Sequence, residues 1–111
     1  MDIIVRQLEI GENEKLKHIF GHRVFCREED GFITNKKFPN GWIDSLDEIS
    51  IHIVAEYNNE IIGSSRLTIF NSYTIPSIFN SLFETIKFEE ESQIALFSKA
   101  SVSPKFRNMG I

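Results

Sequence analysis

The sequence predicts a single α+β domain in which a mainly antiparallel sheet is flanked by helices. Three observations lead to this prediction. A stretch with apolar residues at helical spacing follows a first strand-like run, a β-hairpin pattern occupies the middle of the chain, and another strand-like run lies near its end. The chain has 111 residues, which suits one domain with a modest core.

The N-terminal part predicts a strand followed by a helix. Residues 3–10 mix β-branched and polar side chains as a strand does, and Gly11 ends the run. Residues 12–29 predict a helix, because apolar side chains recur on one face: Leu16, Ile19, Phe20 and Val24. Arg23 falls in the same stripe, so its guanidinium is expected either to extend to solvent or to meet a carboxylate.

Residues 30–50 are rich in turn formers and show no clean period. This segment is longer than the roughly 12–15 residues at which irregular loops become uncommon. Its aromatic side chains, Phe32, Phe38 and Trp42, argue against disorder. We therefore expect an ordered loop that folds over a site.

The clearest predicted element is a β-hairpin. Residues 51–57 and 60–70 are strand-like, and Asn58 and Asn59 can adopt the positive φ angles of a tight turn. Strand alternation then predicts one shared face for Ile62, Ser64, Arg66 and Thr68, and the other for Gly63, Ser65, Leu67 and Ile69. Arg66 is thus expected to project from a sheet face.

The C-terminal part predicts a second helix and a further strand. Pro76 can start a helix whose apolar residues continue to Ile86 at helical spacing. Residues 94–102 predict a strand, which Pro104 ends. If a helix followed the terminal loop, the loop N–H groups and the helix dipole would bind an anionic phosphate.

Composition argues against several classes of protein and site. The formal net charge is −4, with basic residues scattered among acidic ones, so a nucleic-acid binder is not expected. No apolar run approaches membrane-spanning length. Cys26 is the single cysteine, which excludes an intramolecular disulfide and predicts a cytoplasmic location. We interpret Cys26 as a small, partly buried residue, although His18 or His22 could activate its thiol. The two histidines have the spacing of a helical zinc pair but lack the glutamate of that motif, so no metal site is predicted.

Four segments together carry a resemblance to a known family: "HRVFCREEDGF", "WIDSLDEISIHIVAEYNNEIIGSSRL", the helix led by Pro76, and "FSKASVSPKFRNMGI". In order and spacing they resemble the first half of an N-acyltransferase of the GNAT superfamily. The branch that they resemble contains autoinducer synthases, N-acyl amino acid synthases and exosortase-associated acyltransferases. The resemblance implies a GNAT-like fold for residues 1–111, which would form a single partial domain truncated after the fourth strand.

The resemblance also implies a donor site and a direct reaction. The donor would be acyl-CoA or the phosphopantetheine of an acyl-carrier protein, and an acceptor amine would attack its thioester. The family's donor strand and phosphate loop correspond here to Val102, Arg107, Asn108, Met109, Gly110 and Ile111. The strand would separate from its neighbour to admit the pantetheine arm, with a backbone amide polarising the carbonyl.

Further positions that the resemblance marks as catalytic are Arg23, Asp44, Asp47, Arg66 and Lys99. The family pattern has a glutamate where this chain has Trp42, an arginine at Lys99 and another glutamate at Leu96. Because leucine cannot hold an ammonium group and lysine lacks the bidentate fork of arginine, an acceptor other than that of homoserine lactone synthesis is expected. A structural alternative is that Asp44 and Asp47 cap turns and pair with Arg23 or Arg66.

Three interpretations remain open from the sequence. The first is an N-acyltransferase acting on a small, amino acid-like amine. The second is a truncated, non-catalytic remnant that binds an acyl ligand weakly or forms a homodimer through an open sheet edge. The third is an unrelated α+β domain whose likeness to the family is accidental.

Overall fold

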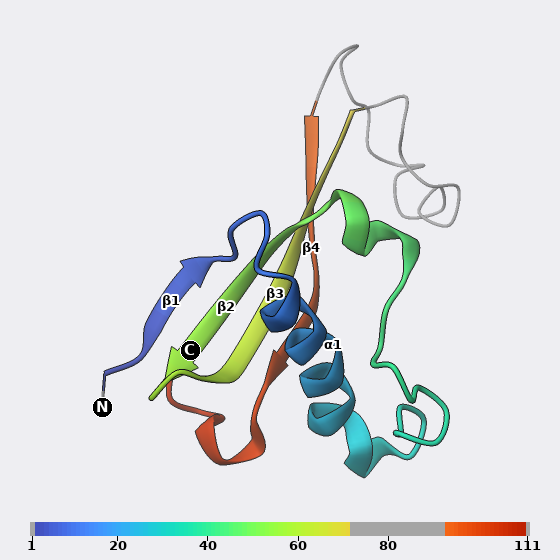
Figure 1. The fold of residues 1–111 in the computed structure, drawn as a ribbon, viewed down its shortest axis with the longest axis vertical. Coiled ribbons are helices and arrows are strands. Elements are labelled where there is room, and N and C mark those ends of the chain that lie inside the picture. Colours follow the sequence, from blue (N-terminus) through green and yellow to red (C-terminus); the bar gives the residue numbers. More distant parts are fainter. Residues whose placement is uncertain (1, 72–92, 111) are drawn as a thin grey trace.

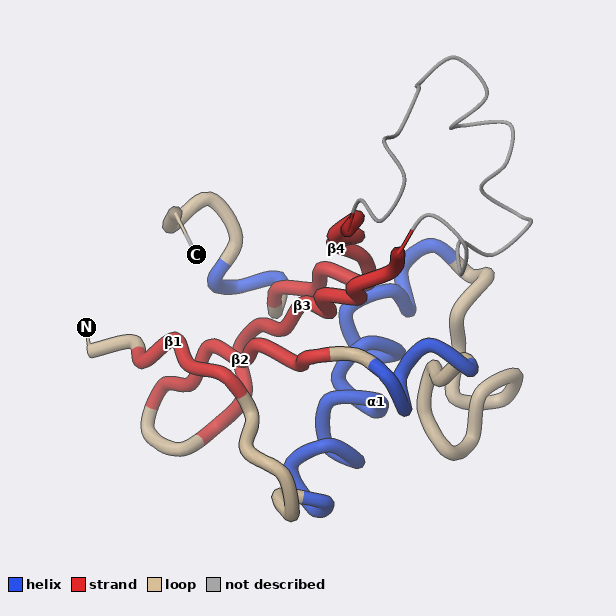
Figure 2. The backbone as a smooth tube through the Cα atoms, turned by 90° about the horizontal axis from the view of Figure 1, so that it is seen from above, coloured by secondary structure: helices blue, strands red, loops and turns tan. Residues whose placement is uncertain are grey.

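The computed structural model describes residues 2–71 and 93–110. Four strands form one antiparallel sheet in the order β1-β2-β3-β4: β1 (Ile4–Gln7), β2 (Ile51–Tyr57), β3 (Glu60–Asn71) and β4 (Gln93–Val102). Helix α1 (Asn13–Arg27) covers one face of this sheet, and the segment after β4 lies against the opposite face (Figures 1 and 2). The predicted α+β architecture is confirmed. The predicted helix at Pro76 lies outside the described residues.

Helix α1 forms where the apolar period predicted it. Its Ile19 and Phe20 pack on Val54 of β2, with Leu8 and Leu16 around them. This contact is the main apolar link between the helix and the sheet. This packing therefore fixes the position of the next turn of α1 relative to the strands.

Ion pairs fasten the start of α1 to the sheet. The Glu56 carboxylate, buried on β2, accepts from Arg6 Nε at 2.7 Å and also pairs with Lys15 of α1. Arg6 pairs in addition with Glu12 at 2.8 Å. Strand β1 is shorter than predicted and ends at Gln7, and the chain then turns toward α1 at Gly11, where φ is 98°.

The hairpin turn is confirmed, but one facing assignment in β3 is wrong. Asn58 and Asn59 have φ of 49° and 64°, as a tight turn requires. A bulge between Ala55 and Glu56 shifts the register of β3. Ile62 consequently packs with Ala55 and Phe106 on the face opposite α1.

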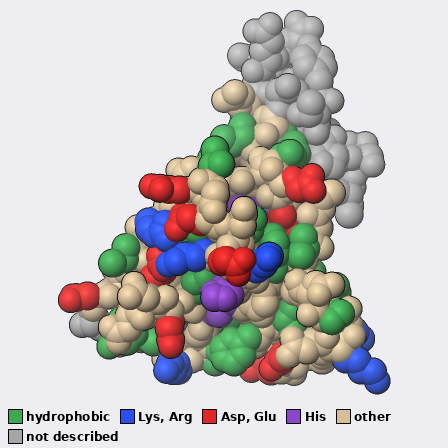
Figure 3. Space-filling view, viewed as in Figure 1, with side chains coloured by type: hydrophobic (Ala, Val, Ile, Leu, Met, Phe, Trp, Pro, Cys, Tyr) green, Lys and Arg blue, Asp and Glu red, His purple; other side chains and the backbone are tan. Residues whose placement is uncertain are grey.

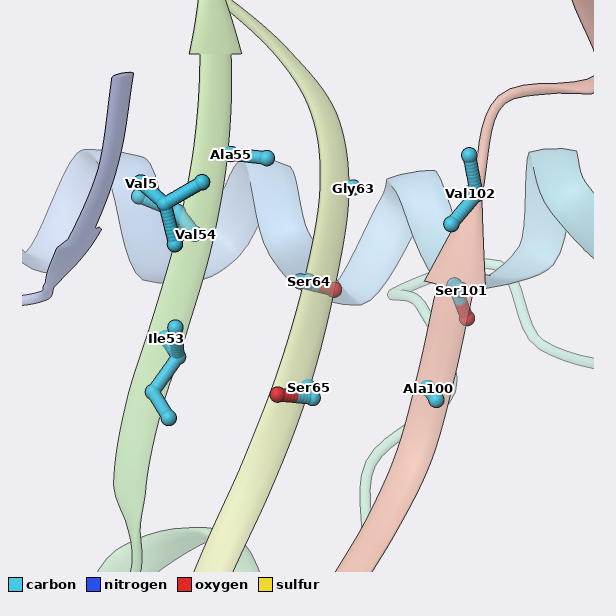
Figure 4. Close-up of a pocket in the computed structure, with 10 residues that line it drawn as sticks. All are labelled: Val5, Ile53, Val54, Ala55, Gly63, Ser64, Ser65, Ala100, Ser101 and Val102. Carbon is cyan, nitrogen blue, oxygen red and sulfur yellow. The ribbon is translucent and has the colours of Figure 1, made fainter. Parts of the chain in front are cut away.

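The face opposite α1 is covered at one end and hollow beside it. The 3-10 helix η4 (Pro104–Phe106) places Phe106 against Ala55 and Ile62. Figure 4 shows the neighbouring hollow, which is lined by residues of all four strands, among them the small residues Gly63, Ser65 and Ala100. Among the described residues, no helix is long and apolar enough to cross a membrane.

Candidate functional site

Two aspartates frame the site because a short helix cap fixes them. The 3-10 helix η2 (Ser45–Ile49) follows the turn-rich segment and begins at Asp44. Asp44 Oδ1 accepts from the N–H of Leu46 at 2.9 Å, and Asp47 Oδ2 accepts from the N–H of Asp44 at 2.9 Å. The turn-capping alternative is therefore realised, and it leaves both carboxylates pointing at the sheet and α1.

Arg23 meets a carboxylate, which was one of the two outcomes expected for it. Its guanidinium lies 2.9 Å from Asp47 Oδ1 and donates to Asp47 Oδ2 at 3.1 Å, with side-chain exposures of 1% and 3%. It also donates to the main-chain carbonyl of Trp42 at 3.0 Å. Burial raises the pKa of Asp47, but the hydrogen bonds from Arg23 and from the N–H of Asp44, together with the charges of Arg23 and Arg66, hold that pKa below its ordinary value.

Arg66 links both aspartates to β4. Its Nη1 donates to Asp44 Oδ1 and lies 3.4 Å from Asp47 Oδ1, while its Nε donates to Ser98 Oγ at 3.0 Å. Burial raises the pKa of Asp44, but the hydrogen bonds from Arg66 and from the N–H of Leu46, together with the charges of Arg66 and Lys99, keep that pKa below its ordinary value. Asp44 remains 40% exposed, so a ligand can reach its carboxylate.

Lys99 enters the site through a bulge in β4. Lys99 and Ala100 together lie opposite the single residue Ser65, and Lys99 has a left-handed φ of 54°. Its Nζ lies 3.5 Å from Asp44 Oδ2 and 3.6 Å from the ring centroid of Trp42. Burial lowers the pKa of Lys99, and Asp44 opposes that shift.

The structure thus brings together all five residues that the resemblance marks as catalytic. They come from α1, from the start of η2, from β3 and from β4. Arg23 and Asp47 are sealed inside, whereas Asp44 and Lys99 lie at the solvent side. Sequence reasoning gave the Trp42 ring no role beside Lys99, and an aromatic residue within a turn-rich segment was its only signal.

The segment after β4 is tied to α1 through Arg107. Its guanidinium donates to the carbonyl of Val102 at 3.1 Å, to that of Cys26 at 2.9 Å and to the Glu29 carboxylate at 2.9 Å. The carbonyl of Cys26 belongs to the last turn of α1. Arg107 therefore holds the predicted donor loop against the helix.

The predicted donor loop continues in a left-handed conformation. Asn108 and Gly110 have φ of 66° and 75°, and Met109 is half exposed. The N–H groups of residues 108–110 donate to no main-chain carbonyl within the described part of the chain. Ile111 lies outside the described residues. A role for this loop in binding a donor remains a prediction.

The lone cysteine is not activated. Cys26 Sγ lies 3.5 Å from His22 Nε2, and that nitrogen also contacts Ser103 Oγ at 2.7 Å. Burial raises the pKa of the Cys26 thiol to about 11 and lowers the pKa of His22. Across residues 2–71 and 93–110, no three His, Cys, Asp or Glu side chains gather to hold a metal ion.

The charged side chains of the face that carries α1 are mixed in sign. Figure 3 shows acidic and basic groups next to one another over the middle of this face. The arrangement suits a small polar ligand better than an extended polyanion.

Comparisons with known proteins identify the fold. No protein-family model matches the sequence. No curated protein matches it either. An aminoglycoside acetyltransferase from an uncultured soil metagenomic sample has a similar structure, with a TM-score of 0.63, 16% identity and coverage of 100% of this chain and 64% of its own. The fold is that of a GNAT-like acyltransferase.

The structural similarity spans nearly all of this chain but only part of each solved structure. An acetyltransferase of the GNAT family from Streptococcus agalactiae gives a TM-score of 0.47 at 12% identity, covering 97% of this chain and 62% of its own. This chain therefore spans less than two thirds of the length of either protein. The predicted GNAT-like fold class is confirmed, and at these identities the likeness extends to the fold alone.

Proposed function

We propose that this chain belongs to an N-acyltransferase that moves an acyl group from acyl-CoA or an acyl-carrier-protein thioester to an amino acid-like amine. The observation that carries the proposal is the cluster of Arg23, Asp44, Asp47, Arg66 and Lys99 at the β4 bulge of a GNAT-like fold. Bulges occur preferentially beside active sites, where they re-aim a side chain.

The reaction needs an oriented amine and little else from the protein. The acceptor ammonium first loses a proton to solvent, and its neutral nitrogen then attacks the thioester carbon. A C–N bond forms, the C–S bond breaks, and the proton released from the nitrogen neutralises the leaving thiolate. Asp44 is the exposed carboxylate, and its low pKa keeps it ionised, so it would hold the acceptor ammonium rather than remove its proton. Holding the amine beside the thioester supplies the proximity on which such transfers depend.

The basic residues would take different parts. Lys99 is the cation nearest to solvent and would pair with the acceptor's carboxylate as a point charge. Arg66 is already engaged by Asp44 and Ser98, so it would position Asp44. Arg23 and Asp47 are buried and would hold η2 in place.

The donor would lie along the end of β4. The N–H groups of residues 108–110, which donate to no main-chain carbonyl among the described residues, would bind its phosphate. The hollow in Figure 4 lies beside Val102 and Ala100, and its lining is mainly apolar, which suits an acyl or pantetheine chain. Acyl-CoA and carrier protein share this phosphopantetheine chemistry.

A second candidate is a non-catalytic protein that binds acyl ligands weakly or pairs with another copy. It is favoured by the position of β4, which is one of the two edge strands of the described sheet. An unpaired strand edge can add a strand from a second chain.

Product analysis separates the two candidates. The chain is incubated with a long-chain acyl-CoA or acyl-carrier protein and a panel of amino acids, and N-acyl products are sought by mass spectrometry. We expect product formation that Asp44→Asn and Lys99→Ala lower in kcat/KM, while the exposed control Glu14→Gln has no effect. Binding of acyl-CoA without any product would instead support the non-catalytic candidate, and sedimentation would test its pairing.

A further inference from the structure

A second cleft shares Asp47 with the site described above but otherwise lies outside it. Its walls are the segment joining β1 to α1, residues 7–13, and the segment from η2 into β2, residues 47–52. The N–H of Leu8 donates to the carbonyl of His52 at 2.8 Å and holds the two walls together. Neither Asp44 nor Lys99 lines this cleft.

The charge of this cleft is negative. Among the residues that the structure describes, its lining contains no lysine or arginine and four acidic residues: Glu9, Glu12, Asp47 and Glu48. Two of the four are neutralised, because Arg6 pairs with Glu12 at 2.8 Å and Arg23 pairs with Asp47 at 2.9 Å. The carboxylates of Glu9 and Glu48 have no ion pair or hydrogen bond with any described residue. One lies on each wall, so two negative charges remain uncompensated.

A buried nitrogen among the lining residues also lacks a partner. His52 is 6% exposed and lines the cleft. Its Nε2 lies 3.0 Å from the main-chain carbonyl of Asp47, and a carbonyl only accepts, so Nε2 carries the proton. Nδ1 is then an acceptor, and it has no hydrogen-bond partner within the described part of the chain. Buried acceptors without a donor are uncommon in folded proteins.

We propose that this cleft binds an organic primary ammonium ion. An N–H of the ligand donates to His52 Nδ1, and its charge is balanced by Glu9 and Glu48. The alkyl part of the ligand lies against Leu8 and the exposed side chain of Ile49. Because Nδ1 is buried, a slim –NH₃⁺ group reaches it with less displacement of the walls than a bulky cation does.

The cleft communicates with the candidate acyl-transfer site through one residue. The carbonyl of Asp47 accepts from His52, while its carboxylate pairs with Arg23. A ligand that fixes His52 therefore also fixes the residue that caps η2. Binding itself does not depend on acyl transfer, so the ammonium site and the proposed reaction stand or fall separately.

The test follows binding directly on the full chain. Butylammonium is titrated into ¹⁵N-labelled protein, and the main-chain amides and the His52 ring nitrogens are observed by NMR. We expect saturable shifts confined to residues 7–13 and 47–52, with a matching shift of His52 Nδ1. Tetramethylammonium, which has the charge but no N–H, is expected to bind at least about tenfold more weakly. Equal binding of the two cations would overturn the role of Nδ1.

Charge variants complete the test. Glu9→Gln and Glu48→Gln each replace an exposed side chain, and each is expected to weaken butylammonium binding by about two- to fivefold. Glu60→Gln, an equally exposed change outside this cleft, serves as the matched control and leaves binding unchanged. Shifts that fail to saturate, or an equal loss in the control, would show only general attraction of cations and overturn the site.

Discussion

Replacing Asp47 by asparagine tests whether the buried ion pair stabilises the site. The change keeps the shape of the side chain and one oxygen for the cap of η2, but it removes the charge opposite Arg23. Two charge-assisted contacts, at 2.9 and 3.1 Å, lose their ionic partner. Breaking such a pair from one side costs about 3–5 kcal/mol, and the retained oxygen favours the lower end, about 3 kcal/mol.

The effect has a defined pH dependence. The pKa of Asp47 is lower in the folded protein than its ordinary value of about 3.9, so the ionised form is favoured by folding. Its contribution to stability is therefore present above about pH 4 and is lost as pH falls through the folded pKa. The difference between the wild type and Asp47→Asn should be largest near neutral pH and should shrink in acid.

Urea unfolding can be followed by the fluorescence of Trp42, the single tryptophan. It measures the loss of unfolding free energy in Asp47→Asn and the dependence of that loss on pH. Glu14→Gln is the control, because its pair with Lys17 is exposed and spans 3.5 Å, and it should change the unfolding free energy by less than about 0.5 kcal/mol. A loss below about 1 kcal/mol for Asp47→Asn, or a loss that stays constant from neutral to acid pH, would refute the reasoning.

Three further outcomes are expected. Gly41→Ala should lower the free energy of unfolding by at least about 2 kcal/mol in urea titrations, since φ is 94° and a Cβ would lie 2.5 Å from Phe20 Cβ; an unchanged midpoint would contradict the close approach. Cys26 should resist alkylation in the native protein and react fully in urea, because burial raises its pKa to about 11; rapid native labelling would contradict this. Asn59→Gly should stabilise the hairpin by a few tenths of a kcal/mol and Asn59→Val should cost about 1–2 kcal/mol in the same titration, given φ of 64°; equal effects would argue against the left-handed turn.

The sequence predicted the buried face of α1 and the turn of the β-hairpin. The helical period placed Arg23 on the buried face of α1 and predicted that its guanidinium would either reach solvent or meet a carboxylate, and the structure supplies Asp47. The Asn58–Asn59 pair predicted its own turn, because few residues accept two consecutive positive φ angles. The period of a helix and a two-residue turn depend on residues close together in the chain, so one sequence was sufficient to predict them.

Features that depend on strand pairing were beyond the sequence. Alternation assigned Ile62 to the same face as Arg66, but the bulge at Ala55 moved it to the other side. The neutralisation of Glu12 and the orphaned acceptor of His52 could not be predicted either, since both depend on how distant segments meet. A period of two holds only while neighbouring strands stay in register.

The bulge at Lys99 connects the fold to the proposed chemistry. Strict alternation would place Ser98 and Lys99 on opposite faces of β4, yet both reach the cluster around Arg66 and Asp44. A lysine in the left-handed region costs roughly 1–2 kcal/mol, and a cation over an aromatic ring returns about 0.5–2 kcal/mol, so the contacts with Trp42 only about offset the strain. A glycine would hold the same backbone without strain. The lysine is therefore better explained by what its amine can bind than by what it adds to stability, and strain of this kind gathers at functional sites.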